Sequence, residues 1–144
     1  MSEVVEAARL WIGTPYMHQA SRRGAGCDCL GLIRGVWRDL RGVEPVELPP
    51  YTRHWSEPAG REALLEAARQ FLLERPIEPT MPGRVLLFRM RQAGVAKHLG
   101  IVSTSYPAPR FIHAYSGRAV RETTLSQPWR RRVVAAFDFP EETR

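Results

Sequence analysis

The sequence predicts a single α+β domain of 144 residues, in which helices come first and an antiparallel β-sheet of about five strands follows. Two observations carry this prediction. In the first half of the chain, apolar residues recur at helical spacing. In the second half, short segments rich in β-branched and aromatic residues are separated by Gly, Pro and Ser, which is typical of strands joined by turns. One domain spanning residues 1–144 accounts for both halves.

Three helices are expected in the first half, over residues 2–12, residues 29–41 and about residues 60–74. The second is the best defined, because Asp28 stands at its N-cap position and Gly42 follows its last turn. Pro76 is expected to close the third. Between these two helices, residues 43–59 contain four prolines and predict a long surface loop. Its mixture of aromatic and basic residues fits either a cleft wall or a docking surface for another protein.

Five short strands are expected after the third helix. They cover residues 85–90, 98–104, 110–115, 119–124 and 132–139. Because the connections between them are short, neighbouring strands should pair as antiparallel hairpins. The helix over residues 29–41 is expected to pack on the sheet that these hairpins form.

The chain carries 21 basic and 15 acidic side chains, for a formal net charge of +6, and Lys97 is its only lysine. Such a charge attracts anionic partners, whether nucleic acid, an anionic lipid surface or bacterial cell wall. The densest basic run, residues 130–132, is shorter than the basic blocks typical of nucleic-acid patches. We therefore expect no specific nucleic-acid partner.

The sequence predicts neither a membrane span nor a signal peptide. No apolar run approaches the ~18 residues that a spanning helix needs, so no membrane insertion is expected. The N-terminus has two acidic residues and no basic stretch, unlike a signal peptide. Synthesis in the cytoplasm is the expected consequence.

Cys29 is the strongest candidate for a reactive side chain. It stands in the first turn of the helix over residues 29–41, after a glycine-bearing approach. The amides and the positive dipole end of a helix N-terminus favour a thiolate, and so lower the pKa of a thiol there. Small neighbours such as Gly31 would let a substrate carbonyl approach these amides, which could then hold an oxyanion.

A nucleophilic thiol needs a base, and two histidines stand on neighbouring predicted strands. His98 begins the strand over residues 98–104, and His113 lies in the strand over residues 110–115. If these strands pair, both rings can project from one face, with His98 within reach of Cys29 and His113 within reach of His98. This is the arrangement of a nucleophile, a base and a residue that orients the base.

Cys27, Cys29, His98 and His113 could also be considered as four zinc ligands. In structural zinc sites two to four residues usually stand between the two cysteines of a pair, whereas a single residue stands between Cys27 and Cys29. We therefore expect no metal and no cofactor, and we interpret Cys27 as a structural thiol.

These residues, in this order, resemble the NlpC-type, papain-like cell-wall peptidases over about residues 7–139. The motifs that carry the resemblance are Pro15-Tyr16, Asp28-Cys29-x-Gly31, His98-x-Gly100-Ile101 and His113. Residues 11–21 and 27–37 look like the subgroup encoded with phage tails and phage-like gene transfer agents. The chain departs from the commonest pattern at Leu30, where a serine usually stands, and at His18-Gln19-Ala20, where a Gly-Gly pair is usual.

The resemblance implies a papain-like fold and a Cys29–His98–His113 catalytic set. It implies a peptidoglycan stem peptide as substrate, cut between D-glutamate and the diamino acid. It also implies that Tyr16 helps to shape the oxyanion or substrate site, and Asp28 and His18 are further candidates there.

The subgroup predicts that the protein is incorporated into a phage-like particle, with tail or baseplate proteins as partners and the cell wall as its place of action. An alternative is a structural tail or baseplate module with weak or no catalysis.

Overall fold

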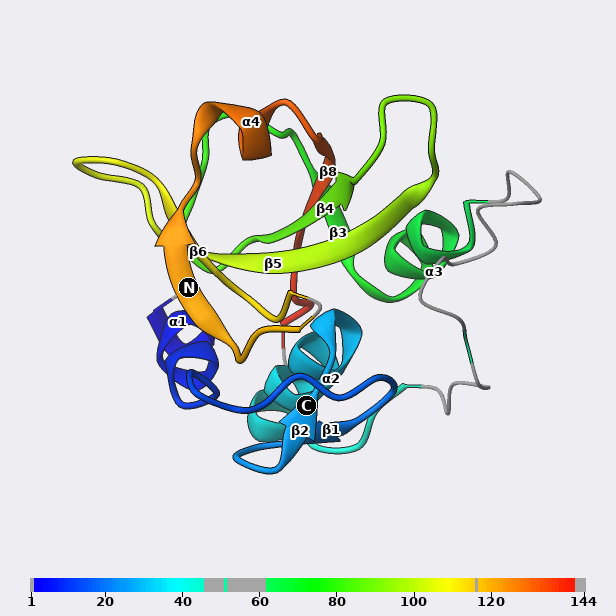
Figure 1. The fold of residues 1–144 in the computed structure, drawn as a ribbon, viewed down its shortest axis with the longest axis vertical. Helices are drawn as coiled ribbons and strands as arrows, with labels where there is room; N and C mark the ends of the chain where they lie inside the picture. The colour runs from blue at the N-terminus through cyan, green and yellow to red at the C-terminus, as the bar shows by residue number, and fades with distance from the viewer. Residues whose placement is uncertain (1, 46–50, 52–61, 116, 142–144) are drawn as a thin grey trace.

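The computed structural model describes residues 2–45, 51, 62–115 and 117–141 (Figure 1). Within these residues the chain forms four helices and eight strands. The helices are α1 (Ser2–Arg9), α2 (Cys29–Arg41), α3 (Ala63–Phe71) and α4 (Gln127–Arg130). The strands are β1 (Ser21–Arg22), β2 (Gly26–Cys27), β3 (Leu73–Arg75), β4 (Val85–Arg89), β5 (Ala96–Thr104), β6 (Arg110–His113), β7 (Arg121–Thr124) and β8 (Val133–Asp138).

The predicted α2 helix is confirmed, together with both of its ends. At the N-cap, Oδ1 of Asp28 accepts a hydrogen bond of 2.7 Å from the amide of Gly31. After the last turn, Gly42 adopts a positive φ of 82°, and its amide donates to the carbonyl of Arg38. The first helix is shorter than predicted, because α1 ends at Arg9 and the following residues form single turns.

The third helix was predicted too long, since α3 ends at Phe71 and the chain turns extended at Leu72. Leu73–Arg75 forms β3, which pairs antiparallel with β8, so Pro76 follows a strand and not a helix. All three residues of β3 are exposed, and such a strand has no apolar alternation to mark it in the sequence. Most of the predicted loop over residues 43–59 lies outside the described residues.

The main sheet is antiparallel and has six strands in the order β3-β8-β4-β5-β6-β7. Its five longer strands fall where the sequence predicts them, within a few residues, and β3 adds the sixth. A second pairing, between the two-residue strands β1 and β2, precedes α2 and was not predicted. The α+β class is therefore confirmed, with helices α1 and α2 followed in the chain by the sheet.

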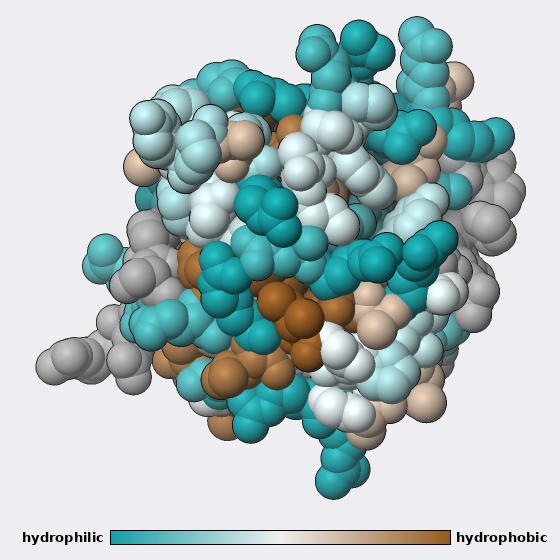
Figure 2. Space-filling view, turned by 60° about the vertical axis from the view of Figure 1, so that its left-hand side comes forward, coloured by the Kyte–Doolittle hydropathy of each residue, from teal (hydrophilic) through white to brown (hydrophobic). Residues whose placement is uncertain are grey.

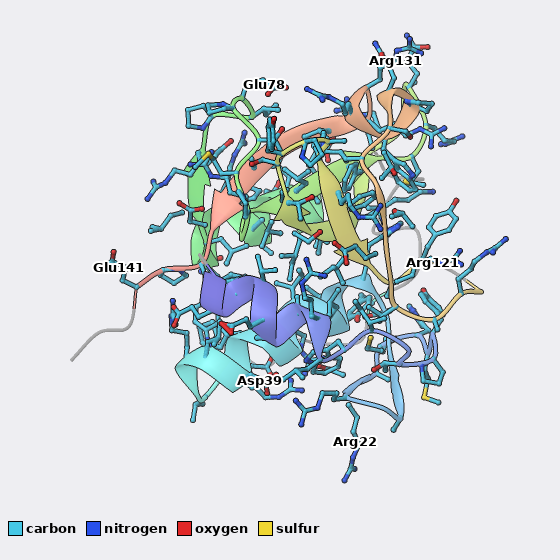
Figure 3. The ribbon with its side chains drawn as sticks, turned by 90° about the vertical axis from the view of Figure 1, so that its left-hand side faces the viewer. Arg22, Asp39, Glu78, Arg121, Arg131 and Glu141 are labelled. Carbon is cyan, nitrogen blue, oxygen red and sulfur yellow. The ribbon has the colours of Figure 1, made fainter. Side chains whose placement is uncertain are left out.

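The sheet has a buried cluster on each face. Helices α1 and α2 cover one face, and this first cluster includes Cys29, Leu99 and Ile101. The second cluster includes Phe88 and Phe111, against which Trp129 of α4 packs. Figure 1 shows α4 on the side of the sheet away from α2, and the turned view of Figure 3 shows α1 and α2 together beneath the sheet. No helix in the described part of the chain is long and apolar enough to cross a membrane.

Candidate active site

The thiol of Cys29 lies at the N-terminus of α2, against strand β5. The residue is 9% exposed, and Sγ donates a hydrogen bond of 3.9 Å to the carbonyl oxygen of Lys97. Burial, together with the negative charge of Asp28, raises the pKa of the Cys29 thiol to about 12. The backbone groups of Leu99 and Leu30 act in the opposite direction. The prediction that the helix N-terminus lowers the pKa of Cys29 is therefore wrong, because the effect of burial, which raises this pKa, is larger than the effect of the backbone amides, which lowers it.

His98 and His113 are brought together by the pairing of β5 with β6. Both residues are buried, and Nε2 of His98 lies 2.8 Å from Nδ1 of His113. Gly100 makes room for His113 and its neighbour Phe111, because a Cβ at this position would lie 3.2 Å from Cβ of His113 and 2.6 Å from the ring of Phe111. The His98-x-Gly100 motif thus has a packing reason as well as a chemical one.

Aromatic rings enclose the imidazole of His98 on the second face of the sheet. The ring centroids of Phe88, Tyr115 and Trp129 lie 5.6, 5.5 and 5.5 Å from its own. Burial lowers the pKa of His98 well below its usual value, and the charge of His113 adds to this effect. Burial, with the charge of Arg121, lowers the pKa of His113 to about 4. Both imidazoles are therefore neutral at neutral pH.

The structure does not join Cys29 to His98 by a hydrogen bond. The thiol belongs to the cluster under α2, whereas the ring of His98 packs against Phe88 and Trp129 of the opposite face. The two groups flank the same stretch of β5, since the thiol bonds to the backbone of Lys97, next to His98. Within the described residues, Nδ1 of His98 has no hydrogen-bond partner, which leaves this nitrogen available to accept a proton.

Asp28 ties two other segments to the start of α2. Its carboxylate is buried, and besides capping the helix it accepts bonds from the hydroxyl of Tyr51 (2.6 Å) and the amide of Gln19 (2.7 Å). His18 lies beside it, with Nδ1 3.8 Å from Oδ2 of Asp28 and Nε2 2.9 Å from the carbonyl oxygen of Tyr51. The carboxylate of Asp28 thus binds other groups of the same chain, and these hydrogen bonds hold the segment around residue 19 against α2.

Tyr16 lies beside the segment that leads into Cys29. It forms an isolated bridge with Cys27, and its side chain packs against the first core cluster. Gly31 permits this close approach of the upstream segment, because a Cβ there would lie 1.9 Å from the carbonyl oxygen of Ala20. The space next to Gly31, which the sequence suggested for a substrate carbonyl, is therefore occupied by a carbonyl of the chain.

Cys27 is fully buried in β2 as a free thiol, and burial raises its pKa to about 12. Cys27 and Cys29 form no disulfide. Among the described residues, no group of three or more His, Cys, Asp or Glu side chains is placed to hold a metal ion.

Three residues of this region were not singled out from the sequence. Trp129 covers both imidazoles from α4, a four-residue helix that no sequence pattern marked. Oγ1 of Thr123 lies 3.2 Å from Nε2 of His113, but no motif in its strand indicated a functional residue. Tyr51 falls in the proline-rich loop, where the aromatic and basic composition was the available signal.

The fold is the papain-like fold of NlpC/P60 proteins. A lipoprotein-like member of the NLP/P60 family from Staphylococcus aureus matches 98% of this chain with 19% identity and a TM-score of 0.62. An NlpC/P60 family protein from Bacillus cereus matches 93% with 17% identity and a TM-score of 0.62. The NlpC/P60 domain of the peptidoglycan hydrolase SagA matches 95% with 20% identity and a TM-score of 0.60.

The match spans different shares of these proteins. It covers 41% of the Staphylococcus aureus protein and 38% of the Bacillus cereus protein, but 97% of the SagA domain. The sequence matches no protein-family model and no curated protein. At these identities the structural likeness defines the fold, and function has to be argued from the site.

Proposed function

We propose that the protein is a cysteine endopeptidase that hydrolyses amide bonds in peptidoglycan stem peptides. The observation that carries the proposal is a free thiol at a helix N-terminus, set against strand β5, whose His98 forms a buried hydrogen bond with His113 of β6. The NlpC/P60 fold supports it, since one protein with this fold is described as a peptidoglycan hydrolase. Cys29, His98 and His113 form the proposed catalytic set.

In the proposed reaction, Sγ of Cys29 attacks the substrate carbonyl while Nδ1 of His98 takes the thiol proton. In the structure the two groups flank β5 on opposite faces, so this step requires the start of α2 or the ring of His98 to move until Sγ and Nδ1 meet. The transfer accompanies the attack, because a neutral thiol and a neutral imidazole form the resting pair. His98 then protonates the leaving amine, and water hydrolyses the thioester with His98 as base. His113 orients His98 throughout through their hydrogen bond.

The substrate side of the site is assigned to Tyr16, Asp28 and His18. Backbone amides at the start of α2 would hold the oxyanion, with help from Tyr16. Asp28 supports this region through its bonds to Gln19 and Tyr51. We assign the cut to the bond between D-glutamate and the diamino acid, on the resemblance of the sequence motifs. The net charge of +6 suits a polymer that bears carboxylates.

The biological setting we propose is a phage-like tail or gene transfer agent that opens the cell wall. The sequence strings over residues 11–21 and 27–37 support this setting by their resemblance to that subgroup. Tail or baseplate proteins would then be the partners of the domain. Co-purification of the protein with such particles would support the setting, and its absence from purified particles would contradict it.

The activity is tested by incubating purified protein with peptidoglycan and analysing the released fragments by mass spectrometry. We expect the wild-type protein to release stem-peptide fragments and the Cys29→Ala variant to release none. Equal release by the two proteins would contradict the assignment of Cys29 as nucleophile.

The alternative, a structural module with weak or no catalysis, is favoured by the state of the thiol. Cys29 is buried, its pKa is raised, and its hydrogen bond goes to the backbone. A thiol-directed reagent at neutral pH separates the two functions. Labelling that disappears in Cys29→Ala, but not in Cys27→Ala, supports the enzyme. Because the raised pKa makes labelling slow at neutral pH, a folded protein in which Cys29 stays unlabelled even at about pH 9 supports the structural module.

A further inference from the structure

A continuous chain of hydrogen bonds on the second face of the sheet ends at Thr123. Nε2 of His98 lies 2.8 Å from Nδ1 of His113, and Nε2 of His113 lies 3.2 Å from Oγ1 of Thr123. Both distances fall in the range of hydrogen bonds. Within the part of the chain that the structure describes, Thr123 is the only hydrogen-bond partner of this nitrogen of His113. The proposed reaction uses the two histidines and leaves the hydroxyl without a role.

The pairing of β6 with β7 explains how Thr123 reaches His113. His113 is opposite Arg121 in the register, and Phe111 is opposite Thr123. His113 and Thr123 are thus diagonal neighbours on one face, a spacing that a ring and a hydroxyl can bridge. The next residue, Thr124, is exposed and alternates to the other face of the strand. Thr124 is therefore a suitable control for Thr123, because it is the same residue type in the same strand but does not face the histidines.

The hydrogen-bond chain can run in two directions, and only one of them leaves His98 able to act as a base. If Nε2 of His98 donates to His113, Nδ1 of His98 keeps its lone pair and can accept the thiol proton. His113 then carries its own proton on Nε2 and needs an acceptor there. In the reverse direction His98 carries its proton on Nδ1, and that nitrogen cannot take another from the neutral ring.

We propose that Thr123 is a positioning residue that accepts a hydrogen bond from Nε2–H of His113 and thereby fixes the tautomer of His98. This inference rests on the proposed function, since it assigns His98 as the base. Both histidine rings are buried, so water does not readily replace the hydroxyl as acceptor. Thr123 acts through His113 and has no need to touch the substrate.

Three variants and two measurements test this role. Thr123→Val keeps the shape of the side chain and removes the acceptor, Thr123→Ser keeps the hydroxyl, and Thr124→Val is the matched control. The first measurement is kcat/KM for hydrolysis of a stem peptide. The second is the ¹⁵N NMR spectrum of the imidazoles in the free protein, which reports the nitrogen that carries the proton. Circular dichroism checks that each variant is folded.

We expect the wild-type spectrum to show His113 protonated on Nε2 and His98 unprotonated on Nδ1. Thr123→Val should lower kcat/KM about threefold to tenfold, which is the worth of one hydrogen bond, and should weaken the Nε2–H preference of His113. Thr123→Ser should restore most of the rate and the wild-type tautomer. Thr124→Val should change neither measurement.

The inference is overturned if wild-type His113 carries its proton on Nδ1. It is also overturned if a folded Thr123→Val variant keeps the wild-type tautomer, whatever its rate, because a merely structural role would leave the tautomer unchanged. The NMR measurement needs no turnover. A wild-type protein that fails to hydrolyse the peptide would therefore count against the proposed function, and the imidazole spectrum would still decide the role of Thr123.

Discussion

Burial makes both the thiol of Cys29 and the imidazole of His98 neutral at neutral pH. Each charged form loses hydration inside the protein, so the pKa of the thiol rises and that of the imidazole falls. The negative charge of Asp28 acts on the thiol in the same direction as burial. The proposed enzyme therefore starts from a neutral pair and generates its thiolate only as the proton moves to His98.

The raised pKa of Cys29 predicts slow alkylation at neutral pH, with a rate that rises about tenfold per pH unit because only the thiolate reacts. Asp28→Asn removes the negative charge, and its Oδ1 can still accept the cap bond from Gly31. We expect this variant to be alkylated faster than wild type at the same pH. The measurement is the rate of mass gain at Cys29 in a Cys27→Ala background. A rate that does not change with pH between 7 and about 9 would contradict the raised pKa.

The lowered pKa of His113 predicts that the protein loses stability in acid. A group whose pKa is depressed on folding contributes stability above its unfolded pKa and loses it as the pH falls through the folded value. For His113 this window runs from the usual 6.5 down to about 4, a difference of about 3 kcal/mol in the free energy of unfolding. His98 acts in the same direction.

Denaturant unfolding at pH 7 and pH 5 measures this effect. Wild-type protein should lose stability between these two pH values, and His113→Gln should lose less, because the glutamine does not titrate. An equal loss in both proteins would show that folding does not lower the pKa of His113.

At the scale of the elements, α2 carries the proposed nucleophile, Cys29, and two glycines that admit close neighbours. A Cβ at Gly35 would lie 1.9 Å from Cζ2 of Trp11, which is buried and whose indole donates to Asp39 of the same helix. This contact fixes the chain after α1 on the helix. Gly31 admits the carbonyl of Ala20 in the same way. Together the two glycines hold the segment that bears Tyr16 beside the start of α2.

Gly35→Ala is therefore expected to destabilise the protein by about 1–3 kcal/mol, the usual cost of overpacking a core. Helix propensity alone predicts the opposite sign, a gain of roughly 0.5–1 kcal/mol. The free energy of unfolding decides between them. In the double variant with Trp11→Leu the loss should be smaller than the sum of the two single losses, because the smaller side chain leaves room for the methyl group. A more stable Gly35→Ala variant would contradict the close packing.

The elements that can be predicted best from the sequence are those whose ends and buried faces are determined by residues within or next to the element. Helix α2 has a cap, a terminal glycine and an apolar stripe, so its bounds could be predicted. Strand β3 depends on β8, more than fifty residues later in the chain, and α4 is held by the aromatic cluster it covers. Cys29, His98 and His113 stand in local motifs, whereas Thr123 and Trp129 reach the histidines only through the assembled sheet.

At the scale of the whole molecule, three acidic residues, Glu44, Asp138 and Glu122, each pair with two arginines. Two of the three, Asp138 and Glu122, thereby connect distant parts of the chain. Six of the basic side chains are thereby matched, yet the total charge of the chain remains +6. Figure 2 shows hydrophilic residues over much of the visible face, with a hydrophobic area among them. The charge favours an anionic partner without specifying its chemistry, and the specificity of the proposed reaction rests on the site.

The most direct test of the central claim uses a synthetic stem peptide that contains the bond between D-glutamate and the diamino acid. Wild-type protein and Cys27→Ala should cleave this bond at similar rates, since Cys27 is a buried free thiol to which the proposed reaction gives no role. Cys29→Ala should give no product above the rate in buffer, as measured by mass spectrometry. Cleavage by Cys29→Ala at the wild-type rate, or no cleavage by any of the three folded proteins, would contradict the account.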